Sequence, residues 1–297
     1  MCIVYIADRY GVAIADISTG DYFVTELPDS SRLMDEIYKF SPSEIICNEA
    51  FLVSGYDMED LKSRLHMSVS SLESHMFDDD GCRRILMRHF KVNTLIGLGV
   101  EEFPTGILAA GALLQYLYDT QKTDLEHFTH ISPYLTSKYM LLDSSTRRNL
   151  ELTETLREKQ KRGSLLWVLD KTKTAMGGRL LRNYIEQPLI DKEEMEKRLD
   201  AIQELNQDSI SRDEIREYLN PVYDLERLLS KVTYKTANPR DLIAFRNSLQ
   251  MLPPIKTVLA GFQKEELAAI REEIDGLEDI YQLIDEAIVE EPPISIR

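Results

Sequence analysis

Two aspartates near the N terminus, Asp8 and Asp16, come closest to a catalytic pattern by type and position. Both stand at the ends of strand-like segments, and nucleases that use two divalent metal ions hold those ions with inward-facing carboxylates. However, Asp8 adjoins an Arg-Tyr-Gly turn and Asp16 precedes a Ser-Thr-Gly turn, where short polar side chains cap the backbone. Turn capping is the favoured interpretation, and a metal-dependent nuclease that uses Asp8 and Asp16 is the alternative.

The other chemical candidates are weaker. The run Asp78–Asp80 is typical of the first turn of a helix, because neighbouring helical carboxylates do not converge on one ion but do complement the helix dipole. His127 and His130 lack a third zinc ligand. Glu102 stands where a dinucleotide loop beginning at Gly97 would need its third glycine. We therefore predict no catalytic, cofactor-binding or metal-binding residues.

The charge of the chain opposes nucleic-acid binding. The 297 residues carry 35 basic and 51 acidic side chains, a net charge of -16, whereas affinity for nucleic acid comes mainly from cations that displace phosphate counterions. The imbalance is uneven: residues 1–125 hold 10 basic against 20 acidic residues, and residues 143–240 hold 19 against 18. Any DNA contact is therefore expected in the middle section.

The three cysteines and the N terminus predict a cytoplasmic protein. Cys2, Cys47 and Cys82 are odd in number, widely spaced and outside any zinc-ligand pattern, which favours reduced thiols. The N terminus runs directly into strand-like residues without the basic region of a signal peptide. No apolar stretch approaches the roughly 20 residues of a membrane span, so no membrane contact is expected.

Residues 1–125 predict an α/β domain. Strands rich in Val, Ile, Tyr and Phe are expected first as an antiparallel meander and then in alternation with helices. The predicted strands are Cys2–Asp8, Val12–Ile17, Tyr22–Leu27, Glu44–Asn48 and Val69–Leu72, and the predicted helices are Ser31–Phe40, Met58–Leu65, Asp78–Phe90 and Thr105–Gln121. A meander extended by parallel strands is the order of an RNase H-like fold.

Residues 126–297 predict an all-α bundle, because apolar residues recur there with helical spacing. Its helices are expected to begin at the capping residues Ser164, Asp191, Ser211 and Asn238. One long helix is expected over Lys264–Val289, and Trp167 and Tyr184 are expected to pack in the core.

Basic residues gather around a short polar helix that is expected near the beginning of this bundle. They are Arg147, Arg148, Arg157, Lys159, Lys161 and Arg162. Glu151, Glu154 and Glu158 are interleaved with them, and on a helix Glu158 would pair with Arg162 at i,i+4 spacing. A solvated, internally paired face is therefore favoured over a surface that meets phosphates or an acidic partner.

Three long segments carry a family resemblance. LLDSSTRRNLEL at Leu141–Leu152 and SLLWVLDKTKTAMGGRLLRNYIEQPLID at Ser164–Asp191 resemble the beginning of the helical core of the MutS family, ATP-driven proteins that find mismatched base pairs in DNA. GVAIADISTGDYFVTEL at Gly11–Leu27 resembles the connector domain of the same family. The resemblance implies an RNase H-like connector domain over residues 1–125 and the N-terminal portion of the core, or lever, domain over residues 126–297.

The sequence lacks the motifs of the ATPase domain and of the mismatch-binding domain of such a protein. No Gly is followed by Lys, so the ATPase phosphate loop G-x-x-x-x-G-K-[S/T] is missing. No Phe has Glu two positions later, so the family's F-x-E mismatch wedge is missing too, and the resemblance ends at Arg297, where the DNA clamp would begin. We expect a central fragment without mismatch-binding, clamp or ATPase domains, without catalysis and without a cofactor of its own.

The resemblance also implies partners. The whole protein would bind mismatched double-stranded DNA as a homodimer, use ATP with Mg²⁺, and recruit a MutL-type protein. This fragment would serve as scaffold, allosteric connector and MutL-docking module.

Overall fold

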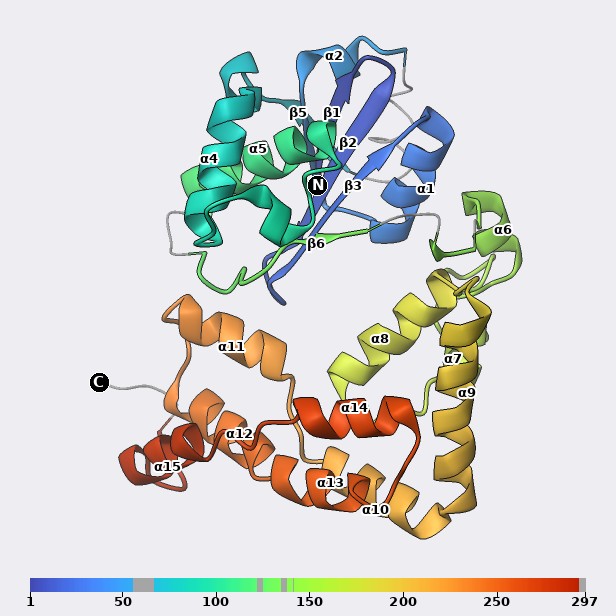
Figure 1. Cartoon of the computed structure of the whole chain (residues 1–297), viewed down its shortest axis with the longest axis vertical. Coiled ribbons are helices and arrows are strands. Elements are labelled where there is room, and N and C mark those ends of the chain that lie inside the picture. Colours follow the sequence, from blue (N-terminus) through green and yellow to red (C-terminus); the bar gives the residue numbers. More distant parts are fainter. Residues whose placement is uncertain (56–66, 122–124, 135–137, 141, 294–297) are drawn as a thin grey trace. The chain divides into compact units, whose positions relative to one another are not determined.

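The computed structural model describes residues 1–55, 67–121, 125–134, 138–140 and 142–293 (Figure 1). They form two compact units, an α/β unit of Met1–Ser137 with Leu141–Arg147 and a helical unit of Lys138–Met140 with Arg148–Arg297. The helix predicted over Met58–Leu65 lies outside the described residues. Among the described helices, none is both long enough and apolar enough to cross a membrane.

A six-stranded mixed sheet forms the centre of the α/β unit, in the order β5-β4-β1-β2-β3-β6. β1, β2 and β3 are antiparallel, whereas β4 pairs with β1, β5 with β4 and β6 with β3 in parallel. The strands are β1 (Cys2–Ile6), β2 (Arg9–Asp16), β3 (Asp21–Leu27), β4 (Glu44–Cys47), β5 (Ser68–Ser71) and β6 (Ser132–Pro133). The predicted meander with parallel additions is thus confirmed.

Helices cover both faces of this sheet. The described helices are α1 (Ser30–Phe40), α2 (Glu49–Leu52), α4 (Asp79–His89) and α5 (Pro104–Gln121), with 3₁₀ helices η1 (Ser74–Phe77) and η2 (Leu95–Leu98). Strand alternation sends Cys2 and Val4 toward the core beneath α4 and α5, and Ile3 toward the core beneath α1 and α2. The unit is therefore a three-layer sandwich (Figure 1).

The α/β unit continues past residue 125, the predicted end of the first domain. Leu125, Phe128 and Ile131 are buried in the core beneath α4 and α5, and β6 then joins the edge of the sheet. Because these apolar residues are buried against the first unit, the segment belongs to that unit and not to the helical one.

The N terminus of α5 lies directly against the sheet. A Cβ on Gly11 of β2 would stand 2.1 Å from the carbonyl oxygen of Thr105 in the first turn of α5. The Glu26 carboxylate accepts a hydrogen bond from the Thr105 amide at 3.0 Å, and its other oxygen pairs with Arg9 at 3.0 Å. The longest helix of the unit is therefore anchored to β2 and β3 at its first turn.

The helical unit contains a series of mostly short helices. They are α7 (Leu165–Leu169), α8 (Ala175–Glu186), α9 (Lys192–Gln207), α10 (Ser209–Leu219), α11 (Leu225–Thr233), α12 (Pro239–Leu249), α13 (Leu252–Leu259), α14 (Glu265–Glu273) and α15 (Glu278–Ala287), preceded by α6 (Ser144–Asn149), which spans the end of the first unit. Ser164, Asp191 and Asn238 cap α7, α9 and α12 as predicted. The predicted cap at Ser211 is wrong, because Asp208 caps α10 and Ser211 lies inside it.

Packing in the helical unit is concentrated between α9, α10, α13 and α14, where Ala201, Ile255 and Leu267 belong to one buried cluster. The expectation that Trp167 and Tyr184 pack in the core is wrong, because their exposed fractions are 48% and 39%. α7 buries only Leu166, and α8 has no buried residue. Much of the apolar surface of α7, α8 and α9 is therefore open in this chain.

Ion pairs join helices of this unit that are distant in sequence. Arg179 of α8 donates two 2.7 Å hydrogen bonds to the Asp224 carboxylate at the start of α11, and also binds Glu226. Arg246 of α12 pairs with Asp285 of α15 at 2.7 Å, and only 7% of its side chain is exposed. These contacts hold helices in place where apolar packing is thin.

Candidate functional site

Asp8 and Asp16 do not form a metal site. Asp8 is in a two-residue hairpin turn with Ala7, both at positive φ, and its Oδ1 accepts a 2.7 Å hydrogen bond from the Tyr5 hydroxyl. Asp16 Oδ1 accepts hydrogen bonds from the amide and hydroxyl of Ser18, at 2.8 and 2.7 Å. The two carboxylates stand at opposite ends of β2, roughly 26 Å apart for eight extended residues. The structure therefore gives the nuclease alternative no support.

The other sequence candidates serve local structure. Asp78 caps α4 by accepting a 2.8 Å hydrogen bond from the Gly81 amide, and Asp79 pairs with Arg83. His127 is buried and packs against Phe128, with 4.3 Å between ring centroids. Within the described ranges, no three His, Cys, Asp or Glu side chains are grouped to hold a metal ion.

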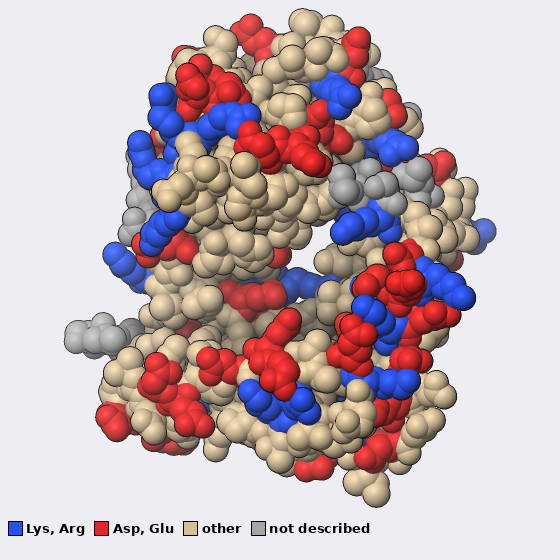
Figure 2. All heavy atoms as spheres, in the orientation of Figure 1, with Lys and Arg blue, Asp and Glu red and all other residues tan. Residues whose placement is uncertain are grey.

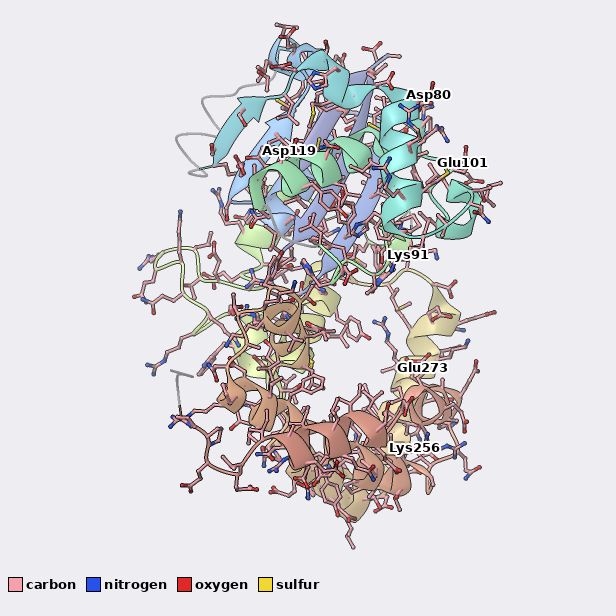
Figure 3. The ribbon with its side chains drawn as sticks, turned by 90° about the vertical axis from the view of Figure 1, so that its left-hand side faces the viewer. Asp80, Lys91, Glu101, Asp119, Lys256 and Glu273 are labelled. Atoms are coloured by element: carbon pink, nitrogen blue, oxygen red, sulfur yellow. The ribbon has the colours of Figure 1, made fainter. Side chains whose placement is uncertain are left out.

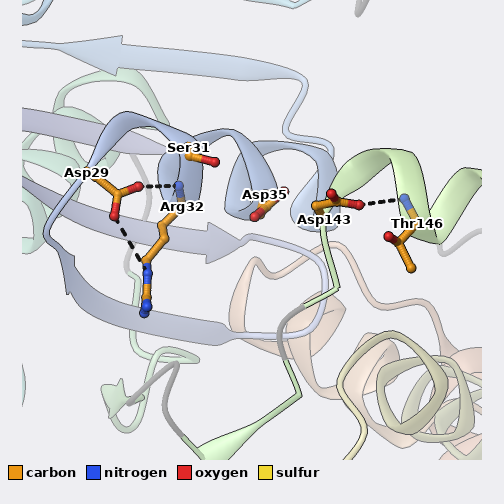
Figure 4. Close-up of a pocket in the computed structure, with 6 residues that line it drawn as sticks. All are labelled: Asp29, Ser31, Arg32, Asp35, Asp143 and Thr146. Carbon is orange, nitrogen blue, oxygen red and sulfur yellow. Dashed lines mark hydrogen bonds and ion pairs between the residues drawn. The ribbon is translucent and has the colours of Figure 1, made fainter.

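A shallow cavity of about 510 Å³ lies on α1 (Figure 4). Its lining residues are Asp29, Ser31, Arg32, Asp35, Asp143 and Thr146. Asp29 accepts a 2.9 Å hydrogen bond from the Arg32 amide at the start of α1, and Asp143 accepts one of 2.6 Å from Thr146 in α6. These carboxylates therefore act at helix starts, and the cavity brings no catalytic groups together.

A stripe of cations on α4 is the most distinctive surface of the α/β unit. Arg84 and Arg88 are exposed one turn apart, and exposed Lys91 follows the end of the helix. Figure 2 shows Lys and Arg atoms gathered over this side of the unit, and Figure 3 places Lys91 at the far end of α4 from Asp80. We call Arg84, Arg88 and Lys91 the α4 stripe. Within the described part of the chain, none of the three has an ion-pair partner.

The opposite face of α4 is held tightly on α5. A Cβ on Gly111 of α5 would stand 2.3 Å from the Cβ of Cys82, so only glycine permits this close approach. On α4, Leu86 lies one turn after Cys82 and is fully buried. At the C-terminal end, the two ring nitrogens of His89 lie 2.7 Å from the Tyr118 hydroxyl and 2.9 Å from the Phe128 carbonyl oxygen. The stripe is therefore presented by a fixed helix.

Two neighbours of the stripe add no net charge to it. Burial lowers the pKa of His89 below its usual value, so this neighbour stays neutral. Arg83, on the same helix, is neutralised by Asp79 and Glu101, each at 2.9 Å. Arg84 and Arg88 were recognisable from the sequence as cations along the predicted helix Asp78–Phe90, but their exposure and lack of ion pairs within the described residues come from the structure.

Two family models match this chain. The model described as MutS domain II covers residues 1–131, and that described as MutS domain III covers residues 145–297, more than half of the chain. The chain belongs to the MutS family. The mixed sheet and the helical unit thus correspond to MutS domains II and III, as the resemblance implied.

Curated relatives extend this similarity over the full chain. Proteins named DNA mismatch repair protein MutS are 57% identical in Lachnoclostridium phytofermentans, 46% in Ruminiclostridium cellulolyticum and 43% in Acetivibrio thermocellus, covering 100%, 97% and 97% of this chain. The matched regions are 32%, 33% and 33% of the relatives, so the chain spans about a third of their length. The missing ATPase and mismatch-wedge motifs are consistent with that share.

Proposed function

We propose that this chain is the connector and the first part of the core of a protein that finds mismatched DNA and signals to a MutL-type partner. The match of its whole length to MutS domains II and III carries the proposal. The longer protein would bind mismatched double-stranded DNA as a homodimer in the cytoplasm and would use ATP with Mg²⁺. This part contributes scaffold, coupling and docking, with no catalysis and no cofactor of its own.

The strand order supports an RNase H-like assignment for the connector. Read from β3, the order is β3-β2-β1-β4-β5, a three-strand meander extended by parallel strands. The RNase H-like fold does not imply a catalytic site in the connector, because fold alone does not determine function. Asp8 and Asp16 are at opposite ends of β2 and do not converge on one site.

The α4 stripe is the surface best suited to dock a protein partner. Its three cations stand out in a chain of net charge -16, so they would attract an acidic surface and orient its approach. Ile96, in the 3₁₀ helix η2 that follows α4, is 72% exposed and offers an apolar contact. Because α4 is fixed on α5, binding would cost little ordering of this surface.

The open apolar faces of α7, α8 and α9 fit the coupling role. Leu180, Leu199 and Ile202 are 51%, 62% and 53% exposed, far more than a helix bundle normally leaves open. In the longer protein these faces would pack against helices from elsewhere in the polypeptide. Movement of those helices would then reach this unit through direct contact.

A titration tests the docking proposal. The chain is titrated with the MutL-type protein of the same organism, with and without a mismatched duplex, and binding is followed by calorimetry. Saturable binding without DNA is expected if the surface is preformed. No binding by a folded chain would refute docking by this part and would leave it as internal scaffold.

Charge reversal identifies the surface. We expect Arg84→Glu with Arg88→Glu to weaken binding at least tenfold, because two attractive contacts become repulsive. Arg157→Glu with Lys159→Glu makes the same change of charge in the helical unit and serves as the matched control in the titration without DNA. Equal weakening by both pairs would show a general charge effect rather than docking on α4.

The absence of catalysis is tested directly. The purified chain is expected neither to bind nor to hydrolyse ATP with Mg²⁺. Measurable turnover that copurifies with the chain through two different columns would contradict the proposal.

A further inference from the structure

The connection between α6 and α7 contains a loop without any apolar side chain. Residues Arg157–Gly163 read Arg-Glu-Lys-Gln-Lys-Arg-Gly, which is four cations and one acid, and every one of them is exposed. We call Arg157–Gly163 the basic loop.

The expected internal pairing of this segment does not occur. Residues 150–163 form turns and no helix, so the i,i+4 geometry that would pair Glu158 with Arg162 is missing. Lys161 alone is neutralised, by the Asp170 carboxylate. Within the described residues, Arg157, Lys159 and Arg162 have no ion-pair partner. The reason for regarding this surface as an internally paired face therefore fails.

Backbone contacts give the basic loop a fixed form. The amide of Thr155 donates to the Gln160 carbonyl at 2.9 Å, and the Thr155 carbonyl accepts from the Lys159 amide at 3.1 Å. At the other end, the amide and hydroxyl of Ser164 donate to the Lys161 carbonyl, at 3.1 and 2.7 Å. The cations are therefore presented by a preformed turn, and binding would not have to order the backbone.

We propose that the basic loop contacts the phosphate backbone of duplex DNA, independently of sequence, through Arg157, Lys159 and Arg162. Lys and Arg are the main phosphate-binding side chains, and such contacts position a protein without reading bases. An acidic protein surface is the competing occupant, because Leu156 and Leu165 beside the loop are 47% and 43% exposed and offer an apolar contact. The loop itself presents only polar side chains, which fits phosphate contacts, and the test distinguishes the two occupants. The inference rests on the proposed function, which brings duplex DNA to the longer protein.

The test is a fluorescence-anisotropy titration of the 297-residue chain against a labelled 30-base-pair duplex at several salt concentrations. Three phosphate contacts predict a slope of about -2.7 for log K against log salt, or roughly a 40-fold loss of affinity from 50 to 200 mM. A homoduplex and a mismatched duplex are expected to bind within twofold of each other.

The variant Arg157→Gln, Lys159→Gln, Arg162→Gln removes the three cations without adding negative charge. It is expected to weaken binding at least tenfold at 50 mM salt and to abolish most of the salt slope. The same three-residue neutralisation on the α4 stripe is the matched control and is expected to change affinity less than threefold. Circular dichroism checks that both variants stay folded, as exposed side chains predict.

Two results would overturn the proposal. The first is equal weakening by both triple variants, which would mean that net charge and not the basic loop governs binding. The second is saturable binding of poly-glutamate, lost in the loop variant, without binding of DNA, which would assign the loop to an acidic protein. The titration contains no MutL-type protein, so the absence of DNA binding would not bear on the proposed docking of a MutL-type partner, which has a separate test.

Discussion

Replacing Gly11 by alanine tests whether the first turn of α5 is locked against the sheet. The new Cβ would stand 2.1 Å from the Thr105 carbonyl oxygen and 2.7 Å from the Gly106 amide nitrogen. Both are backbone atoms, and the Glu26 carboxylate holds the same turn through the Thr105 amide. Neither strand nor helix can therefore move aside without losing hydrogen bonds or packing.

The expected cost of Gly11→Ala follows from this overlap. Overpacking of a close-packed core costs typically about 1–3 kcal/mol, and a backbone clash belongs at the upper end of that range. For a unit of this size, 3 kcal/mol lowers the melting temperature by roughly 6–12 °C. Gly97→Ala is the matched control, because nothing lies within 4 Å of its added Cβ; its stability is expected to change by less than about 1 kcal/mol.

The assay is urea and thermal unfolding followed by far-ultraviolet circular dichroism. Trp167, the single tryptophan of the chain, lies in the helical unit, so its emission reports on that unit separately. The Trp167 transition is expected to stay in place in Gly11→Ala. If Gly11→Ala and Gly97→Ala are equally stable within 0.5 kcal/mol, the argument that α5 is locked onto β2 is refuted.

Two further predictions concern charge and thiols. The Arg179 guanidinium lowers the pKa of Asp224 below its usual value, so their pairing stabilises the fold at neutral pH and this contribution is lost as pH falls from about 4. Arg179→Met is expected to lower the free energy of unfolding by roughly 2 kcal/mol at pH 7. If the variant and the wild type still differed by as much at pH 2.5, this assignment would be contradicted. Burial raises the pKa of Cys82 to about 12 and that of Cys2 above its usual range, and Cys47 is buried too. At pH 8, the thiols of the folded chain are therefore expected to react with a disulfide reagent more than about 100-fold more slowly than those of the denatured chain. Rapid labelling of the folded chain would show that these sites open.

Local features of the fold were readable from the sequence because their causes lie within a few residues. Ser164, Asp191 and Asn238 each accept hydrogen bonds from amides two or three positions ahead, so the capping residue alone identifies the start of a helix. The three strands of the meander follow from β-branched and aromatic runs between turns. The family resemblance was likewise carried by contiguous residues, and the match to MutS domains II and III confirmed it.

The predicted turns and helices were wrong where two local sequence signals compete. The turn expected at Arg9–Gly11 is instead at Ala7 and Asp8, because β2 begins at Arg9 and pairs with β1 from that residue. The long helix expected over Lys264–Val289 is divided into α14 and α15, with Leu277 at positive φ and its amide bonded to Asp275 at 3.0 Å. The Asp-Gly pair at this break is a turn signal that helical periodicity outweighed.

Burial, pairing and surface charge were decided only by the tertiary structure. Helical spacing marked Trp167 as apolar and facing one side, but whether that side is covered depends on which helices reach it. The α4 stripe is a surface because α5 covers the opposite face of α4. Among the described residues, Arg157, Lys159 and Arg162 of the basic loop have no ion-pair partner, because the backbone there turns instead of forming a helix. Local sequence was enough to predict most helices and strands and the family, because their causes lie in contiguous residues. Contacts between distant residues determined which side chains remain exposed and able to bind a partner.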